Sequence, residues 1–503
     1  MSAPKPKWKQ MTPTLFFSCL IFLQGALLFG IDTGSFGSLQ ALPSFLERFG
    51  VQNAAGAYKL PATRTSLMNS LPWIGKFAGC LGSESIIDRF GYKKAMYMGG
   101  FVQIIAIIIE LTAHTWPQFT VGRIIAYSAV GLVENAVPSY SAEVSPAALR
   151  GLLSGSIMFI TGLGNLWGTG MSRAYATTTA QSGWMIPTSM QLIPAVLLLA
   201  LVPWTPESPR WLLLMAGRKE EAQNALDRLR PADDVKNGAT RAEIEALEGV
   251  MKEEEEAAIC VTLFVLEQTN GNQFIQSYAA TFYVDQGQGS KSFTYSMIGQ
   301  VVGILGAAFC ILLIDITGRR PLMVGGSIGC TVLLFLAAGL GTVTDLSTSG
   351  ANVVLACFML LPAFTRISAS TNAFLTGAEI GGVKMRKKIM AFGTCCGVAA
   401  AFLVTFVTPY LLPSMGINIG WIFGSVAAFS VVWSYFFYPE LKGRSLEDVD
   451  ELFEARLPAR RFATYETHGA GRILTEIENS GLPGMQHSKK LDHGNVVLQE
   501  EEA

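Results

Sequence analysis

The sequence predicts an all-α membrane protein with twelve transmembrane helices in two pseudo-symmetric six-helix bundles, which a cytoplasmic helical linker joins. Three observations predict this fold. Half of the 503 residues are hydrophobic and only 15% are charged, and the mean hydropathy is +0.37, outside the balance of a soluble enzyme. Apolar runs of membrane-spanning length recur along the chain, and charged motifs at their ends repeat between its two halves.

The apolar runs are the first element of the argument. Four of them contain no Asp, Glu, Lys or Arg, and each is long enough to cross about 30 Å of hydrocarbon; these are 293–314, 322–343, 389–413 and 419–438. Taken in order, all the apolar runs predict helices near 14–37, 66–87, 94–113, 118–139, 152–174, 185–204, 257–283, 293–314, 321–343, 351–376, 389–413 and 417–438.

A charged stretch separates the first six helices from the last six. It is rich in Glu, Lys and Arg, with Ala and Leu at helical spacing, which predicts short amphipathic surface helices. The expected domains are an N-terminal segment 1–13, a bundle 14–204, the linker 205–256, a second bundle 257–438 and a C-terminal segment 439–503. The last segment lacks apolar periodicity from about residue 459, so we expect disorder there.

Lysines and arginines concentrate at one end of the predicted helices. They occur in the N-terminal segment, the linker and the loops that contain Arg89, Arg150, Arg319 and Lys442. The positive-inside rule therefore predicts that both termini and the linker are cytoplasmic. The basic N-terminus leads into an apolar run without a small-residue cleavage site, which indicates a first spanning helix and not a signal peptide.

Three charged motifs repeat in the same order in the two halves. The paired positions are Asp88 and Asp315, 227 residues apart, Glu143 and Glu379, 236 apart, and Glu207 and Glu440, 233 apart. A parallel repeat of six helices is typical of secondary transporters in which two bundles rock about a central site.

The seventh helix is unusually polar for a segment at membrane depth. Within 266–283, LEQTNGNQFIQSYAATFY, it carries Glu267, Gln268, Thr269, Asn270, Asn272, Gln273, Gln276 and Ser277. Lipid cannot satisfy these groups, so they are expected to face protein or a water-filled cavity. Amides both donate and accept hydrogen bonds, which suits a neutral polyhydroxyl ligand. The alternative is that they only bond neighbouring helices.

Six motifs carry a resemblance to a known family. They are DRFGYKK, GRIIAYSAVG, VPSYSAEVSPAALRG, PESPRWLL, DITGRRP and PELKGRSLEDVDELFE. Together, from about Gly30 to Phe453, they resemble the sugar porter family of the Major Facilitator Superfamily, in particular its fungal branch. The resemblance implies a sugar site between the two bundles. It also implies a secondary active transporter that imports a sugar across the plasma membrane by alternating access, as a sugar:proton symporter.

The resemblance assigns proton coupling to a buried pair. Asp32 lies about halfway along the first helix, and Arg123 begins the fourth. In proton-coupled sugar porters the Asp of the G-x-D-x-G motif exchanges a proton and pairs with the Arg of the GR motif. Burial favours the protonated carboxyl group and a nearby guanidinium favours the ionised one, so rearranging such a pair can switch its protonation. The alternative is a static ion pair between helices.

The resemblance also implies a cytoplasmic gate. Its charged residues would form ion-pair networks that hold the outward-open state, although exposed pairs contribute little singly. The alternative is that they only set topology. The gate residues are Asp88, Arg89, Glu143, Arg150, Glu207, Arg210, Asp315, Arg319, Glu379 and Arg386.

The expected sugar site departs from the family pattern. The first helix-seven Gln of the family is Glu267 here, the Asn is Gln273, the helix-five Gln is Met158 and the helix-ten Trp is Phe374. A carboxylate only accepts hydrogen bonds, so Glu267 should change which hydroxyls are read. We expect substrate contacts from Glu267, Gln268, Asn272, Gln273, Ser277 and Phe374.

These departures predict a pocket that is not a standard glucose site. A disaccharide, a pentose or a polyol are the candidate ligands, and Glu134 is a further acid expected to line the cavity. Family members also carry a basic segment before helix seven, whereas here Glu256 runs directly into Ala257. That connection is either short or has lost a piece.

Other classes of function find no support in the sequence. There is no G-x-x-x-x-G-K-[ST] motif for ATP, no metal-ligand spacing and no nucleophile with a base, so we expect no enzyme, no metal site and no cofactor besides the proton. The net charge of −1 gives no sign of nucleic acid. The expected partners are the sugar and the lipid bilayer, and we expect a monomer. A uniporter with a vestigial Asp32 and a non-transporting sugar receptor are the alternatives.

Overall fold

The computed structural model describes residues 7–52, 56, 58–214, 216–247, 257–284, 286, 291–343, 347–380 and 386–442, and five single residues between 449 and 465. These residues form twelve membrane-spanning segments, most of them one continuous helix and the others two or three helices in line. Among them, seven stretches of helix are long and apolar enough to cross a membrane. The twelve-helix prediction is confirmed.

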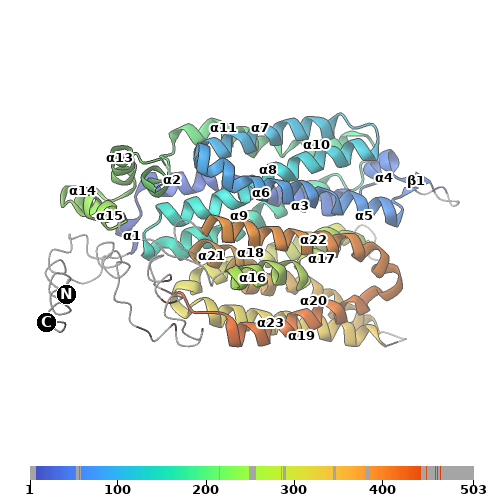
Figure 1. Ribbon diagram of the computed structural model, residues 1–503. Helices are drawn as coiled ribbons and strands as arrows, with labels where there is room; N and C mark the ends of the chain where they lie inside the picture. Colours follow the sequence, from blue (N-terminus) through green and yellow to red (C-terminus); the bar gives the residue numbers. More distant parts are fainter. Residues whose placement is uncertain are drawn as a thin grey trace.

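The first six spans fill the upper half of Figure 1. They are α2 (Pro13–Phe22) with α3 (Gln24–Leu39), α5 (Ala62–Ser70) with α6 (Pro72–Phe90), α7 (Tyr92–Leu111), α8 (Trp116–Val144), α9 (Ala147–Ala174), and α10 (Ser182–Ser189) with α11 (Leu192–Leu201) and η1 (Val202–Trp204). Each span overlaps the corresponding predicted run, with α7 ending two residues short of it, and the break between α5 and α6 falls beside Pro72.

The last six spans fill the lower half of the same view. They are α16 (Ala257–Thr269) with α17 (Asn272–Tyr283), α18 (Lys291–Thr317), α19 (Arg319–Gly341), α20 (Thr348–Thr365) with η3 (Arg366–Ser370) and α21 (Thr371–Glu379), α22 (Arg386–Met415), and α23 (Gly420–Phe437) after the short turn η4 (Gly416–Ile419). The two groups of six lie side by side (Figure 1).

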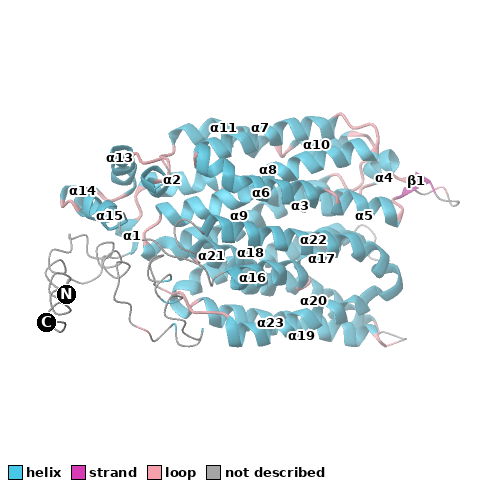
Figure 2. Cartoon of the chain, viewed as in Figure 1, coloured by secondary structure: helices cyan, strands magenta, loops and turns pink. Residues whose placement is uncertain are grey.

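The two ends of the molecule differ (Figure 2). At one end, which we call the linker end, lie α1 (Lys7–Gln10), α12 (Pro209–Leu214), α13 (Lys219–Leu229), α14 (Ala232–Lys236) and α15 (Ala239–Leu247). At the other, the loop end, lie α4 (Pro43–Phe49) and the strands β1 (Val51–Gln52) and β2 (Tyr58–Lys59), which pair antiparallel with Val51 opposite Lys59. The short connection at 248–256 and nearly all of the predicted disordered tail fall outside the described residues.

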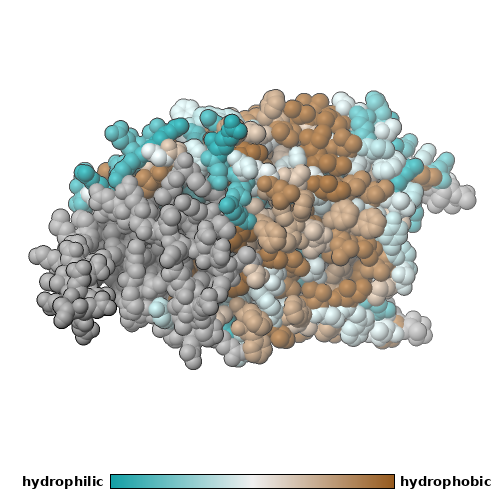
Figure 3. Space-filling view, in the orientation of Figure 1, coloured by the Kyte–Doolittle hydropathy of each residue, from teal (hydrophilic) through white to brown (hydrophobic). Residues whose placement is uncertain are grey.

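The outer surface carries a broad apolar belt between two hydrophilic ends (Figure 3). Large side chains such as Phe101, Leu305 and Leu312 are 61%, 63% and 70% exposed on it. A soluble monomer rarely exposes so extended an apolar surface, whereas lipid tails cover it without cost. The protein is therefore a multi-pass membrane protein. Seven of the eight cysteines are buried, as expected for small apolar residues.

Two spans of the C-terminal half are broken near their middle. The seventh breaks at Gly271, whose φ of 93° favours glycine, and the Asn270 side chain accepts a hydrogen bond from the Asn272 amide there at 3.2 Å. The tenth breaks in η3, where Ser368 has φ −84° and ψ −112°. Breaks of this kind in membrane helices expose backbone polar groups and occur at binding sites.

The two halves contact each other at both ends. At the loop end, Gln40 Nε2 donates to the Ser277 carbonyl at 2.7 Å, and Ser66 Oγ donates to the Phe406 carbonyl at 2.8 Å. On the linker side, Thr394 Oγ1 donates to Asn135 Oδ1 at 3.0 Å. Any cavity between the halves is therefore narrowed from both directions.

Candidate functional site

A buried ion pair lies in the N-terminal half, where the resemblance implies it. Asp32 on α3 and Arg123 on α8 are 1% and 2% exposed, and Oδ2 lies 3.2 Å from Nη2. Arg123 also donates to the Met68 carbonyl and to the Tyr127 hydroxyl, each at 3.0 Å. Gln191 Nε2 donates to the other Asp32 oxygen at 3.4 Å. Both charges are thus held by several partners in a water-poor site.

A second acid, which the sequence analysis missed, lies beside this pair. Glu110 on α7 is buried and close enough to Asp32 and Arg123 to interact with both. Its Oε1 has no hydrogen-bond partner among the described residues. Asp32 forms the ion pair with Arg123, and Glu110 is a second buried carboxyl group near that pair. The signal in the sequence was a lone acid near the end of the apolar run IIAIIIEL.

Two small cavities lie between the spans near the middle of the molecule. The first, which we call the amide cavity, is lined by Asn272, Ile275, Gln276, Gln300, Leu361, Pro362, Thr365 and Arg366. The second, the aromatic cavity, is lined by Gly25, Ala26, Phe29, Glu134, Val137, Ile157, Met158, Thr161 and Phe374.

The predicted sugar contacts divide between these cavities and their surroundings. Asn272 lines the amide cavity and Phe374 the aromatic cavity. Asn272 Oδ1 accepts from Gln276 Nε2 at 3.2 Å and from Thr365 Oγ1 at 3.5 Å. Phe374 packs edge-on against Phe264, with ring centroids 5.1 Å apart. The positions of Met158 and Phe374 therefore do face an internal space.

The other four predicted contacts line neither cavity. Gln268 Nε2 donates to Glu267 Oε2 at 3.0 Å, and Gln273 Nε2 donates to Ser277 Oγ at 2.8 Å. These side chains bond to each other along their own helix, although Gln268 Oε1 is buried without a hydrogen-bond partner among the described residues. A ligand in either cavity would not meet them in this conformation. Helical periodicity explains the difference, because a run of successive polar residues covers all sides of a helix.

The acid Glu134 lines the aromatic cavity, as expected, and it has a partner that the sequence analysis missed. Lys76 Nζ lies 2.7 Å from Glu134 Oε2. The ammonium also lies over the rings of Phe29 and Trp73, at 4.1 and 4.8 Å from their centroids. The signal for Lys76 in the sequence was a lone lysine in the apolar run PWIGKFAG.

Arg366 is the second missed cation of the centre. It begins the break in span ten, is 3% exposed and lines the amide cavity. Its Nη1 donates to the Met158 carbonyl at 2.9 Å, which links the two halves. A single arginine within the apolar run 351–376 was the available signal.

The gate acids at the linker end differ between the halves. In the C-terminal half, Glu379 accepts from Arg319 Nη2 at 2.7 Å and from its Nε at 3.3 Å. In the N-terminal half, Glu143 accepts from the Tyr92 hydroxyl at 2.7 Å and from the Ser208 hydroxyl. Tyr92 stands 227 residues before Arg319, the repeat distance of that motif. Within the described part of the chain, hydroxyl hydrogen bonds to Glu143 thus occupy the place of the Arg319–Glu379 ion pair.

A third pair of acids caps two helices identically. The Glu207 oxygens accept from the amides of Tyr92 and Lys93 at 3.1 and 3.2 Å, and those of Glu440 accept from the amides of Arg319 and Arg320 at 3.0 and 3.1 Å. Each carboxylate therefore lies at a helix N-terminus, where the dipole favours it. The repeat between the two halves therefore includes the hydrogen bonds of these two helix caps.

Glycine permits both of these caps. Gly91 and Gly318 precede the two helices with φ of 87° and 98°, and a Cβ on either would collide with the capping carboxylate. Burial raises the pKa of Glu207, and the amide hydrogen bonds from Ser208, Lys93 and Tyr92 oppose that shift.

The remaining gate residues occupy different environments. The Asp88 carbonyl accepts from Trp211 Nε1 at 3.3 Å, and Arg150 is buried, with Nη2 donating to the Ser145 carbonyl at 3.4 Å. Arg210 is also buried. By contrast, the Arg89 guanidinium is exposed and lies over the Phe90 ring, 5.5 Å from its centroid.

The last two gate residues lie near the boundary between the halves. Asp315 lies 4.0 Å from Arg319, and its carboxylate is close enough to Gly151 of the other half to exclude a side chain there. The side chain of Arg386 is outside the described residues.

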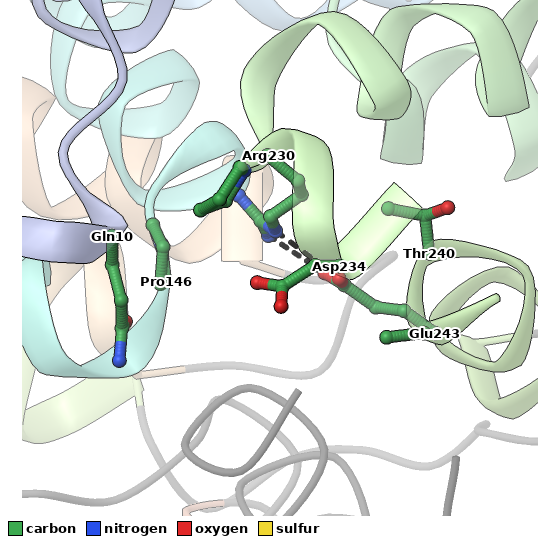
Figure 4. A pocket seen from close by; sticks show the side chains of 8 residues that line it. Gln10, Pro146, Arg230, Asp234, Thr240 and Glu243 are labelled. Atoms are coloured by element: carbon green, nitrogen blue, oxygen red, sulfur yellow. Dashed lines mark hydrogen bonds and ion pairs between the residues drawn. The ribbon is translucent and has the colours of Figure 1, made fainter. Parts of the chain in front are cut away.

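A separate pocket lies at the linker end, between α1, the start of α9 and the linker helices (Figure 4). Arg230 forms a buried two-point pair with Glu243, at 2.7 and 3.1 Å, and donates to the Val144 carbonyl at 2.9 Å. This pocket holds none of the predicted site residues. The hydrogen bond from Arg230 to Val144 connects the linker to the end of α8.

The family profile described as "Sugar (and other) transporter" matches residues 18–453. The chain belongs to this family. It is a fungal-type sugar porter of the Major Facilitator Superfamily and not an enzyme.

Among curated relatives, the chain is 28% identical to the low-affinity glucose transporter HXT4 of Saccharomyces cerevisiae, over 88% of this chain and 81% of that one. It is 26% identical to the major facilitator-type transporter ecdD of Aspergillus rugulosus, over 89% of each. The solved proton:xylose symporter XylE, bound to 6-bromo-6-deoxy-D-glucose, superposes with a TM-score of 0.76 at 22% identity, over 87% of this chain and 99% of that one. This likeness shows the fold.

Proposed function

We propose that this sugar transporter works as a sugar:proton symporter of the plasma membrane that imports its substrate by alternating access. The observation that carries the proposal is the buried pair of Asp32 and Arg123, with Glu110 beside it. An ionisable group at membrane depth is costly and is functional by default. Two buried acids lie near a single arginine here, so one carboxyl group can be protonated while the other pairs with Arg123.

The contacts at both ends support alternating access. Hydrogen bonds close the loop end between Gln40 and Ser277, and the linker side between Thr394 and Asn135. Each is a single bond or a small group of bonds, worth about 1 kcal/mol net apiece. Opening one side at a time is therefore energetically accessible, and the central cavities would face each side in turn.

The orientation in the membrane follows from the charge distribution. Lysines and arginines concentrate at the linker end, so we place that end and both termini in the cytoplasm.

The oligomeric state is a separate proposal. Each half packs its apolar faces against the other, and we propose that the transporter acts as a monomer. A native-mass measurement in a lipid nanodisc tests this proposal.

The decisive experiment is uptake with simultaneous recording of proton movement. The purified protein is reconstituted in liposomes and offered a panel of labelled sugars, among them a pentose, a disaccharide and a polyol. Symport predicts that a transported sugar draws protons inward and that an inward-directed proton gradient drives accumulation. Sugar uptake that never exceeds equilibrium and carries no protons would refute symport.

A uniporter is the second candidate, and one observation favours it. The Asp32 and Arg123 charges are within 3.2 Å and each has further hydrogen-bond partners, which a static structural pair would also show. The same experiment separates the two, since a uniporter equilibrates sugar without proton flux. A receptor that does not transport would show binding in the same preparation and no uptake.

A further inference from the structure

Arg366 presents a buried guanidinium that forms no ion pair with any carboxylate of the described residues. Among the described residues it makes two hydrogen bonds, both from Nη1, to the carbonyl oxygen of Met158 at 2.9 Å and to its sulfur at 3.4 Å. No carboxylate of the described part lies within 4.0 Å of it, and Nε and Nη2 donate to none of these residues. Burying a charge without a partner costs free energy, so the position demands an explanation.

Other buried arginines show what a structural role looks like in this protein. Arg123 pairs with Asp32, Arg319 with Glu379 and Arg230 with Glu243, at 3.2, 2.7 and 2.7 Å. Each of them joins two elements through a carboxylate. Arg366 instead lines the amide cavity. Its unused donors are therefore available to a ligand in that cavity.

The rest of the amide cavity suits a hydroxylated ligand. Asn272, Gln276, Gln300 and Thr365 line it together with Arg366. Amides and hydroxyls exchange hydrogen bonds with sugar hydroxyls, whereas a guanidinium is a planar fork that matches a carboxylate at two points. We propose that the transported ligand is an acidic sugar, a monosaccharide that carries a carboxylate, and that Arg366 binds this carboxylate. The inference rests on the proposed function and names its substrate class.

The acids near Arg366 do not replace such a ligand in this conformation. Glu267 is close enough to interact with Arg366, but its Oε2 accepts from Gln268 and it forms no ion pair with the guanidinium. Glu134 pairs with Lys76 at 2.7 Å. The competing explanation is that Glu267 alone balances Arg366 and that the ligand is neutral.

Matched pairs of ligands separate these explanations. The full-length protein in lipid nanodiscs is titrated with labelled D-glucuronate and D-glucose, and with D-galacturonate and D-galactose. Each pair differs only at C6, which is a carboxylate in one member and a hydroxymethyl group in the other. In at least one pair we expect the acid to bind at least tenfold more tightly than the neutral sugar.

Variants then assign the preference to Arg366. Arg366→Gln should weaken binding of the acid by about 10- to 100-fold, the range for a lost hydrogen-bonded charge, and change binding of the neutral sugar less than about twofold. Arg366→Lys keeps the positive charge but loses the planar two-point geometry of the guanidinium. Its affinity for the acid should therefore lie between those of the wild type and Arg366→Gln. Arg173→Gln, at an exposed arginine that belongs to neither the predicted sugar site nor the gate, is the matched control and should change neither. Thermal unfolding of each variant reports whether it folds.

Each outcome decides the matter. If the neutral sugars bind as tightly as the acids or more tightly, the inference is wrong while sugar transport stands, and this result needs no variant. If Glu267→Gln and Arg366→Gln weaken the neutral sugars alike and leave the acids unaffected, Glu267 is the counter-ion and the inference is again wrong. If neither member of either pair binds or enters liposomes, while the wider panel of sugars also fails, the proposed function is wrong as well.

Discussion

Two buried arginines in corresponding spans of the two halves invite comparison. Arg123 lies on span four and Arg366 on span ten, and both are at most 3% exposed. Arg123 is held by Asp32, by Tyr127 and by a backbone carbonyl. The Arg366 guanidinium donates hydrogen bonds only to Met158 among the described residues, and the residue lines a cavity. The two arginines therefore differ in their partners and not in residue type or burial, and this difference is the basis for proposing different roles for them.

The linker end repeats this division of roles. The Glu379 carboxylate pairs with Arg319, whereas Glu143 accepts from the neutral hydroxyls of Tyr92 and Ser208. The caps by Glu207 and Glu440 are nevertheless the same in both halves. The two halves have therefore kept the contacts that cap these helices and differ in the contacts of the Glu143 and Glu379 carboxylates.

The largest predicted effect breaks the comparison at its centre. Arg123→Met should destabilise the protein by about 3–5 kcal/mol, because it leaves Asp32 as an unpaired buried charge. Arg366→Met should change stability by less than about 1 kcal/mol or increase it, since it removes a buried charge that forms no ion pair with any described carboxylate. Thermal unfolding in the same lipid nanodisc, without ligand, measures both. Equal losses for the two variants would contradict the assignment of different roles.

A smaller effect is predicted at the linker end. Arg319→Met removes a buried ion pair, whereas Tyr92→Phe removes one hydroxyl hydrogen bond worth about 0.5–1.5 kcal/mol. Spin labels at the exposed positions Arg89 and Lys442 report the separation of the halves there. The population with a wide separation should rise more for Arg319→Met than for Tyr92→Phe. The opposite order would show that closure depends mainly on the N-terminal half.

The smallest effect concerns the Glu207 cap. Burial raises its pKa above the ordinary value of 4.5, so the folded protein keeps this proton to higher pH than the unfolded chain does. The resulting stability is complete below about pH 4.5 and is lost as pH rises through the folded pKa. The wild type should therefore lose stability relative to Glu207→Gln over that window. Glu220→Gln, at an exposed acid, serves as the control, and parallel profiles for wild type and Glu207→Gln would exclude this contribution.

The sequence predicted the architecture well because apolar length and charge asymmetry act on whole helices. It predicted poorly which side chains face a cavity. Gln273 and Ser277 bond to each other, and a run of polar residues does not reveal which side of its helix meets the partner half. Lys76, Glu110 and Arg366 were missed although each is a lone charge in an apolar run. Tyr92 was missed because only charged residues were compared across the repeat.

The central claim is that the buried acid of the N-terminal half carries the coupling proton. Asp32→Asn tests it most directly in proteoliposomes, by comparing exchange of a labelled substrate at equal concentrations with uptake driven by an inward proton gradient. Retained exchange shows that the variant folds and binds. The account predicts exchange within a few-fold of the wild type and no accumulation above equilibrium. Accumulation at the wild-type level by Asp32→Asn would contradict it.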